Sequence, residues 1–452
     1  MRALVWQGIN QLGVERVNDP SILNPKDIIV KVGLSSVCGS DLHLIGGYVP
    51  AVKPGDILGH EFLGEIVETG SEVTTLQKGD RVVVVSILGC GQCEHCQRQA
   101  FSCCDNSNPK PEMTEAAYGY GCAGIIGYSH AFGGYSGSHA EYIRVPFGEV
   151  NAFKIPEGVR DEQAVFVSDA VPTGYMGADF AGIEKGDVVA VWGCGGVGLM
   201  AICSAYLMGA ERVIAIDRIP ERLQMAAFQC RAEVINYEEV DVHEALKEMT
   251  GGRGPDRCIE CVGMEAHGTG AQYWYDKAKQ RALMETGRAV ALRQAIRACR
   301  KGGTVSVMGV FGGVIDKFPM GAVVNKALTL RSGQQQGQRY VHELFEHIQE
   351  GRLDPSFLLT HRMPLERGHH AYKLFKDKRD QCVRAVFEPS AIEAMVMDAT
   401  SAVSGSAYAS TTASTAPGTT SATAASAAPV STSTTPTMPA PAATPGTTEP
   451  II

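Results

Sequence analysis

The chain of 452 residues lacks several features that would each point to a different class of protein. It has no uninterrupted apolar run of the ~18 residues expected of a membrane span. Its start, Met1–Trp6, reads as a strand and lacks the apolar core and cleavage site of a signal peptide. It has no basic cluster, and the net charge of −9 argues against a general affinity for nucleic acid. We therefore expect a cytoplasmic protein that binds neither membranes nor nucleic acid.

Cysteine, in contrast, is abundant, and four cysteines form the run C-x2-C-x2-C-x7-C at Cys90, Cys93, Cys96 and Cys104. Four thiolates this close repel one another unless a cation holds them. Zinc binds four thiolates tetrahedrally, and such a site is closed to substrate and therefore structural. Disulfides are the alternative, but they suit small secreted domains rather than a long chain without an export signal. Cys103, beside Cys104, stays open as the fourth ligand.

The composition changes abruptly at the C-terminal end. Residues 398–452 are dominated by Ala, Ser, Thr and Pro, and Asp398 and Glu449 are their only charged side chains. Such a segment buries too little apolar surface to offset the entropy lost on ordering, so we expect it to be disordered. A mucin-like glycosylated stalk is the alternative, but no other feature suggests export.

Two patterns divide the rest of the chain. Residues 1–172 carry short apolar runs punctuated by Gly and Pro, which is typical of a β-rich domain. The clearest of these runs are Ile28–Val32, 65–67 and Arg81–Ile87. From about Ala181 strands and helices alternate, which predicts an α/β domain with a doubly wound parallel sheet. We place this domain at 173–330, a return to the first domain at 331–390, and the disordered tail at 391–452.

The first turn of the predicted parallel sheet has the pattern G-x-G-x-x-G. It consists of Gly193, Cys194, Gly195, Gly196, Val197 and Gly198, between an expected strand at 188–193 and an expected helix at 196–208. Glycines let the backbone approach a pyrophosphate, and the helix N-terminus supplies amide donors. Asp217, at the end of the next expected strand, suits the ribose hydroxyls and would repel a 2′-phosphate. NAD is therefore preferred over NADP, although Arg218 and Arg222 weaken this preference.

A second group of metal-binding residue types lies in the β-rich domain. Cys38 and His60 each stand beside a glycine, and Asp169 comes just before the α/β domain. Three ligands with one open position are the pattern of a catalytic zinc. Each residue also has an ordinary explanation: Cys38 as a small buried hydrophobe, His60 as a core histidine, and Asp169 as a helix cap. Spacing alone does not bring them together.

Several motifs together resemble the zinc-dependent medium-chain alcohol dehydrogenase family over about residues 1–390. They are C-G-S-D-L-H, L-G-H-E-F-L-G-E-I-V, K-G-D-R-V, the four-cysteine run and G-C-G-G-V-G. The resemblance implies a GroES-like catalytic domain, a Rossmann domain for NAD, and a catalytic zinc on Cys38, His60 and Asp169. It also implies that Glu61 is an alternate ligand when the metal moves.

The same resemblance assigns roles around the catalytic zinc. Ser40 would touch the substrate hydroxyl, His43 would continue the proton path to solvent, and Thr173 would lie against the nicotinamide. Hydride would pass between NAD and an alcohol or an aldehyde hydrate. We also expect Arg222 and Val262 to contact the dinucleotide, and the chain to form a homo-oligomer, either a dimer or a tetramer.

Within the family the chain is most similar to the glutathione-independent formaldehyde dehydrogenase branch. Shared stretches are Ser168–Gly174, Asn108-Pro109, 117–120 and Val262–Gly270. The last of these opens an insertion at 264–287, which in that branch covers and retains NAD, so that aldehydes are dismutated without cofactor release. One alternative is a polyol or amino-alcohol dehydrogenase in which Glu61 has a larger metal role. Another is a non-catalytic nucleotide-binding protein.

Overall fold

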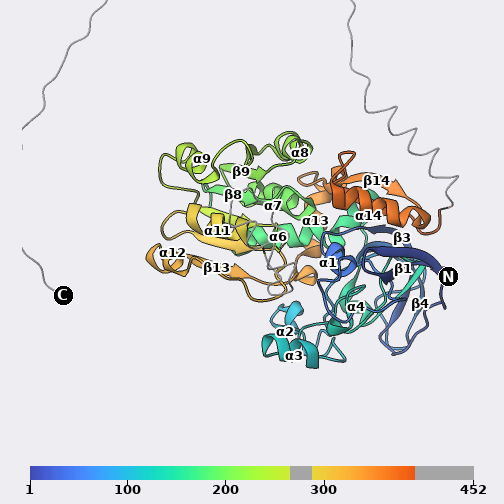
Figure 1. Ribbon diagram of the computed structural model, residues 1–452. Coiled ribbons are helices and arrows are strands. Elements are labelled where there is room, and N and C mark those ends of the chain that lie inside the picture. The colour runs from blue at the N-terminus through green and yellow to red at the C-terminus, as the bar shows by residue number, and fades with distance from the viewer. Residues whose placement is uncertain (265–287, 392–452) are drawn as a thin grey trace, which may run out of the picture. The chain divides into compact units, whose positions relative to one another are not determined.

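The structure, a computed structural model, describes residues 1–264 and 288–391 (Figure 1). The expected tail beyond Ala391 and the expected insertion beyond Met264 lie outside the described residues. The described chain contains a β-rich part and an α/β part, as the sequence predicts.

The β-rich part is built on one large, mostly antiparallel sheet with the strand order β14-β15-β3-β4-β5-β7, and β6 pairs with β3. Its strands are β3 (Ile28–Ser36), β4 (Glu61–Thr69), β5 (Arg81–Val84), β6 (Tyr142–Val145), β7 (Ala152–Lys154), β14 (Leu359–Met363) and β15 (Arg384–Phe387). A separate antiparallel pair, β1 (Arg2–Gly8) and β2 (Gln11–Arg16), stands beside it. The last two strands of the described chain, β14 and β15, thus complete a sheet that begins near the N-terminus.

Short helices punctuate the connections of this part, and two longer ones follow later in the chain. They are α1 (Asp41–Ile45), α2 (Glu94–Gln97), α3 (Glu112–Tyr118), α4 (Gly148–Asn151), α5 (Asp161–Ala164), α13 (Gly337–Gln349) and α14 (Gly368–Asp377). The longer helices are amphipathic. In α13, for example, Tyr340, Val341 and Leu344 face the core.

The α/β part is a six-stranded parallel sheet with the order β10-β9-β8-β11-β12-β13. Its strands are β8 (Val188–Trp192), β9 (Arg212–Asp217), β10 (Glu233–Asn236), β11 (Arg257–Glu260), β12 (Thr304–Val307) and β13 (Thr329–Ser332). Its helices are α6 (Ala170–Ala181), α7 (Gly196–Leu207), α8 (Pro220–Cys230), α9 (Val242–Met249), α11 (Val290–Ala298) and α12 (Met320–Asn325). The strand expected at 188–193 and the helix expected at 196–208 are confirmed as β8 and α7, and Asp217 ends the next strand, β9, as expected.

Helices cover both faces of this sheet (Figure 1). Side chains of successive residues in a strand point to opposite faces, and β8 shows the consequence. Val189 and Val191 belong to the core formed with α6, α7 and α8, whereas Ala190 and Trp192 belong to the core formed with α9 and α11. The β8 strand therefore reads as a continuous apolar run because both of its faces are buried.

The apolar run at Arg81–Ile87 contains a strand and continues beyond it. The strand β5 covers Arg81–Val84. Ser86, two residues beyond the end of β5, is buried, and its hydroxyl donates to the Asp169 carboxylate at 3.2 Å. The last residues of this apolar run therefore contribute to the surroundings of Asp169 rather than to the sheet.

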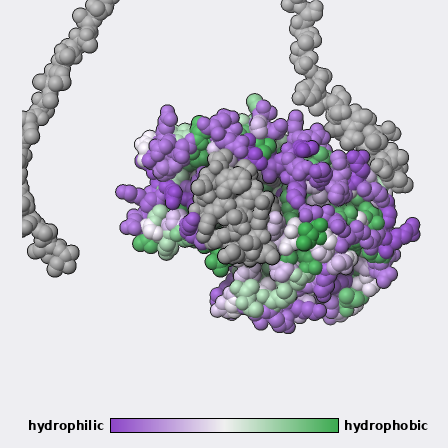
Figure 2. Space-filling view, in the orientation of Figure 1, coloured by the Kyte–Doolittle hydropathy of each residue, from purple (hydrophilic) through white to green (hydrophobic). Residues whose placement is uncertain are grey.

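On the face that Figure 2 shows, the coloured residues are mostly hydrophilic, with small apolar patches among them. No helix among residues 1–264 and 288–391 combines the length and the apolar character that crossing a membrane requires.

The contact between α6 and α7 gives a test of the packing. A Cβ added at Gly174 would lie 2.6 Å from the Ala201 backbone nitrogen and 2.6 Å from Met200 Cβ. Because the two helices would have to separate, Gly174→Ala should destabilise the protein by about 1–3 kcal/mol. Thermal unfolding measures the loss. The control is Gly321→Ala in α12, where a Cβ would meet nothing within 4 Å and stability should not fall.

Candidate active site and two candidate metal centres

The four predicted zinc cysteines lie together in a lobe around α2. The ligand atoms of Cys90, Cys93, Cys96 and Cys104 all lie within 4.8 Å of one another. The Sγ atoms of Cys90 and Cys96 are 4.0 Å apart, and those of Cys93 and Cys104 are 3.9 Å apart. A tetrahedral zinc with Zn–S bonds of ~2.3 Å would place its sulfurs nearly this far apart, ~3.8 Å. The residues therefore fit a structural zinc.

Backbone amides stabilise the sulfur atoms of this lobe. The amides of Gln92 and Cys93 donate to Cys90 Sγ, each at 3.3 Å. Burial raises the pKa of Cys90, but these amides and the Asn106 side chain outweigh it and bring the pKa to about 6. Neutral pH therefore favours the Cys90 thiolate, whereas burial raises the pKa of Cys96 and of Cys104. Cys104 is buried within the cluster whereas Cys103 is exposed, so the geometry favours Cys104 as the fourth ligand.

The second metal-binding group comes from three distant segments. Cys38 follows β3, His60 precedes β4, and Asp169 precedes α6. Asp169 Oδ2 lies 3.4 Å from Cys38 Sγ and 3.7 Å from His60 Nε2. A tetrahedral zinc separates neighbouring ligand atoms by ~3.3–3.8 Å, so these three side chains fit such an ion with one position left open.

Two residues that the sequence analysis missed hold the Asp169 carboxylate. Its Oδ1 accepts hydrogen bonds from Ser86 Oγ at 3.2 Å and from Gln335 Nε2 at 3.0 Å. The Thr173 hydroxyl donates to the same oxygen at 3.4 Å. Gln335 belongs to the run G-Q-Q-Q-G-Q at 333–338, whose unusual composition is the one signal the sequence offers.

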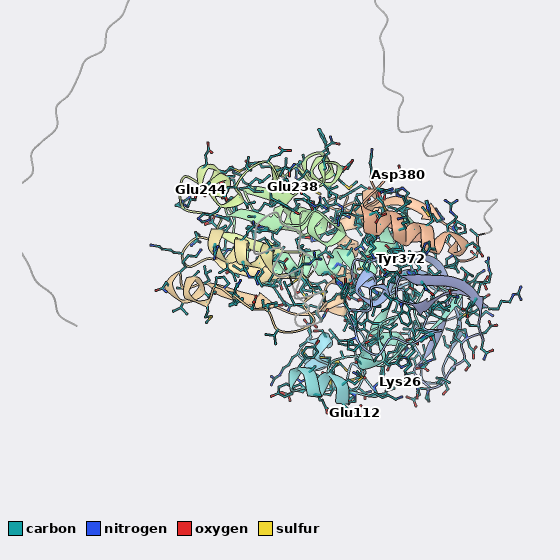
Figure 3. The ribbon with its side chains drawn as sticks, in the orientation of Figure 1. Lys26, Glu112, Glu238, Glu244, Tyr372 and Asp380 are labelled. Atoms are coloured by element: carbon teal, nitrogen blue, oxygen red, sulfur yellow. The ribbon has the colours of Figure 1, made fainter. Side chains whose placement is uncertain are left out.

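Asp41, which the sequence analysis also missed, holds the other two ligands. Its Oδ1 lies 3.2 Å from His60 Nδ1, and its Oδ2 accepts the backbone amide of Cys38 at 2.9 Å. The Tyr372 hydroxyl donates to the same Oδ2 at 3.1 Å. Tyr372 belongs to α14, so the C-terminal part of the described chain supports the metal site (Figure 3).

A buried chain of hydrogen bonds continues behind Tyr372. Its hydroxyl lies 2.8 Å from His139 Nε2, His139 Nδ1 lies 2.8 Å from Ser35 Oγ, and Ser35 Oγ lies 2.7 Å from Ser138 Oγ. Because the tyrosine proton points to the carboxylate, Nε2 of His139 must donate and Nδ1 must accept. The bonds therefore all run in one direction, from Ser138 to Asp41. Burial lowers the pKa of His139 to about 4, which keeps the ring neutral.

The predicted catalytic residues lie next to the metal-binding group. Ser40 Oγ is 3.2 Å from His60 Nε2, and the buried His43 lies in α1 behind it. Glu61 lies outside the cluster of possible metal ligands: its Oε1 accepts the Ala170 amide at 3.0 Å, and its Oε2 lies 3.7 Å from Arg384. Burial raises the pKa of Glu61 to about 7 although Arg384 opposes this. Its role as an alternate ligand stays a prediction.

The glycine turn has the geometry that its motif predicts. Gly193 has a φ of 93°, and a Cβ on Gly198 would lie 1.7 Å from the Gly193 carbonyl oxygen. Neither position tolerates a side chain, so the turn brings bare backbone to the start of α7. Asp217 ends β9 beside the turn, where its Oδ2 accepts the Cys194 amide at 2.7 Å. The residues fit a pyrophosphate and a ribose.

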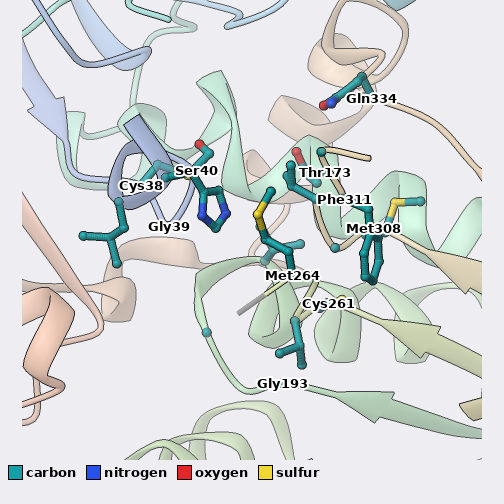
Figure 4. A pocket seen from close by; sticks show the side chains of 18 of the residues that line it. Cys38, Gly39, Ser40, Thr173, Gly193, Cys261, Met264, Met308, Phe311 and Gln334 are labelled. Carbon is teal, nitrogen blue, oxygen red and sulfur yellow. The ribbon is translucent and has the colours of Figure 1, made fainter. Parts of the chain in front are cut away.

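One cavity of about 640 Å³ joins the metal-binding group to the glycine turn. The predicted site residues that line it are Cys38, Ser40, His43, His60, Asp169, Thr173, Gly193, Gly195, Gly196, Val197, Asp217, Arg222 and Val262. Figure 4 shows Ser40 and Thr173 on one side of the cavity, with Gly193 and Cys261 on the other. Gly198, Glu61 and the four lobe cysteines do not line it. Arg384, which the sequence analysis missed, lines it beside Gly196.

Two family models match the chain. One is described as an alcohol dehydrogenase GroES-like domain and matches residues 24–157, and the other is described as a zinc-binding dehydrogenase and matches residues 196–273.

Relatives match most of the described chain. The zinc-type alcohol dehydrogenase-like protein AdhB of Bacillus subtilis is 40% identical over 392 residues, which cover 86% of this chain and 100% of that protein. A glutathione-independent formaldehyde dehydrogenase of the same organism is 31% identical over 389 residues, which cover 78% of this chain and 88% of that protein. The structure of the alcohol dehydrogenase TADH from Thermus sp. ATN1 matches with a TM-score of 0.73 and 34% identity. The match covers 86% of this chain and 99% of that chain.

The lobe gives a prediction about metal removal. Because a structural zinc contributes directly to folding, Cys93→Ser should lower both the zinc content and the thermal stability. Metal analysis and thermal unfolding measure the two effects. The control is Cys103→Ser, the exposed neighbour, which should change neither. A Cys93→Ser protein as stable and as rich in zinc as the parent would show that the lobe holds no structural zinc.

His139 gives a prediction about pH. Its pKa is about 4 in the folded protein but ~6.5 in an unfolded chain, so the unfolded state binds the proton first as the pH falls. The stabilisation is complete above pH ~6.5 and decreases towards pH 4 by up to about 3 kcal/mol. His139→Gln, which has no titrating ring, should remove this part of the acid destabilisation. Denaturant unfolding at pH 7 and pH 4.5 measures it, with the exposed His370→Gln as the control.

Proposed function

This chain belongs to the zinc-dependent medium-chain alcohol dehydrogenase family, and we propose that it transfers hydride between NAD and an alcohol or aldehyde. The observation that carries the proposal is the shared cavity: the three possible metal ligands and the glycine turn both line it. A substrate oxygen at the open metal position would thus lie in the same space as the nicotinamide.

The roles proposed for the residues follow from their places. When bound, zinc polarises the substrate oxygen and makes its proton easier to remove. Ser40, next to His60, takes the substrate proton, and the buried His43 passes it towards solvent. Thr173 stands against the nicotinamide, on the same helix turn as Asp169. Orientation and electrostatics are the protein's share of the reaction.

Residues around the glycine turn support NAD as the cofactor. The Asp217 carboxylate, beside the turn, suits the ribose hydroxyls and would repel a 2′-phosphate. Arg218 lies 3.4 Å from Glu238, and this pairing weakens it as a partner for such a phosphate. The Arg384 guanidinium beside Gly196 is placed to meet the pyrophosphate.

The substrate side of the cavity supports an apolar substrate. Its lining includes the aliphatic and aromatic side chains of Leu42, Ile87, Met113, Ile125, Tyr128 and Phe132. Met113 comes from α3, in the long loop at 110–134. Each CH₂ group that such a wall removes from water contributes about 0.8 kcal/mol to binding. We therefore propose a primary alcohol or aldehyde with a hydrocarbon chain or ring.

A substrate series tests the proposal. With NAD, kcat/KM should rise several-fold from ethanol to hexanol and benzyl alcohol, because each added CH₂ group meets the apolar wall. NADP should give at least tenfold lower kcat/KM than NAD. Asp169→Ala should leave a folded protein, by circular dichroism, that holds one zinc fewer and does not oxidise alcohols.

The same series decides among the other predictions. A preference for formaldehyde, with methanol and formate produced without added NAD, would favour the dismutase prediction. A preference for polyols or amino alcohols would contradict the proposal that the substrate is apolar. No oxidation of any alcohol or aldehyde by a protein with two zinc ions would overturn the proposed function. The predicted homo-oligomer and cytoplasmic location stay predictions.

A further inference from the structure

The third possible zinc ligand, Asp169, has two oxygens, and only one of them faces the other ligands. Oδ2 lies 3.4 Å from Cys38 Sγ and 3.7 Å from His60 Nε2. Oδ1 points to a different set of partners, Ser86, Gln335 and, at the longer distance of 3.4 Å, Thr173. If the Asp169 carboxylate rotated about its Cβ–Cγ bond, Oδ1, or both oxygens, would face the metal position. Neighbouring groups must therefore hold the carboxylate in its orientation.

The Gln335 side chain is itself held in one orientation. Its Nε2 lies near three acceptor oxygens: Asp169 Oδ1 at 3.0 Å, the Asp169 carbonyl at 3.1 Å and the Ser168 carbonyl at 3.0 Å. Its Oε1 lies 3.0 Å from Ser86 Oγ, whose single proton is shared between this oxygen and Asp169 Oδ1. Exchanging the amide oxygen and nitrogen would set an oxygen against three acceptors, so the amide cannot flip. The side chain is also buried, with 4% of its surface exposed.

The place of Gln335 in the chain adds a second constraint. It stands between β13, the edge strand of the parallel sheet, and α13, which packs against α6 in the main core. Asp169 immediately precedes α6. The backbone on each side of the Gln335–Asp169 contact is therefore fixed by packed secondary structure.

We propose that Gln335, supported by Ser86, is a positioning residue that makes Asp169 a zinc ligand through Oδ2 alone. By occupying Oδ1, it leaves one oxygen for the metal and keeps the fourth metal position open for substrate. A cysteine at position 169 would have a single ligand atom and would need no such partner. The inference rests on the proposed catalytic zinc.

Zinc release from the holoenzyme tests this role independently of activity. We expect Gln335→Leu to release one of two zinc ions to a chromophoric chelator at least tenfold faster than the parent. The catalytic zinc is identified as the ion that Asp169→Ala lacks. The matched control is Gln338→Leu, another buried glutamine of the same segment. The buried Gln338 donates to the Ile87 carbonyl at 2.7 Å and to Asn151 Oδ1 at 2.8 Å, and neither of these partners is a proposed metal ligand.

A double substitution separates positioning from general damage. In the Asp169→Cys background, Gln335→Leu should change zinc release less than twofold, because no second oxygen needs to be held. An equal effect in both backgrounds would overturn the proposal. Equal rates of zinc release from Gln335→Leu and Gln338→Leu, each made in the parent, would also overturn the proposal. This second comparison is the test to use if Asp169→Cys does not bind a second zinc. A parent with only one zinc would instead contradict the proposed function.

Discussion

Burial of a thiolate, an imidazole and a carboxylate in one place is the constraint on which the rest of this structure depends. Cys38, His60 and Asp169 are all buried, and two of them carry negative charge in the form that binds metal. Without a cation such a group is unfavourable, because desolvation disfavours charge and the two anions repel each other. A zinc ion neutralises them. The surrounding hydrogen bonds then decide where the ligand atoms stand.

Those hydrogen bonds come from segments that are far apart in the chain. Asp41 holds the Cys38 amide and the His60 ring, while Ser86 and Gln335 hold Asp169. Tyr372, from α14, supports Asp41 in turn. The metal site is therefore a product of the whole described fold rather than of its N-terminal third. The glycine turn lines the same cavity, so the possible metal ligands of the β-rich part and the glycine turn of the α/β part share one cavity.

Local features were predictable from the sequence, and long-range ones were not. The four lobe cysteines lie within one short stretch, so their spacing alone identifies a zinc site. The glycine turn and Asp217 are also read from a strand–turn–helix pattern. In contrast, Cys38, His60 and Asp169 were joined only by family resemblance. The buried partners Ser86, His139, Gln335 and Tyr372 were missed because their roles depend on tertiary packing, which no local period reveals.

The one-way chain of hydrogen bonds from Ser138 to Asp41 has a consequence for sequence variation. His139 and Tyr372 are separated by 233 residues, yet they are hydrogen-bond partners. The His139 ring donates from Nε2, and the Tyr372 hydroxyl oxygen accepts. Replacing either one alone leaves a buried polar atom without a partner, which costs about 1–3 kcal/mol. Replacing both by apolar residues of matching shape removes the penalty at the bond that they share, and the cost that is left falls on their outer partners, Ser35 Oγ and Asp41 Oδ2. Among relatives, these two positions should therefore vary together, as a correlated pair that an alignment would reveal.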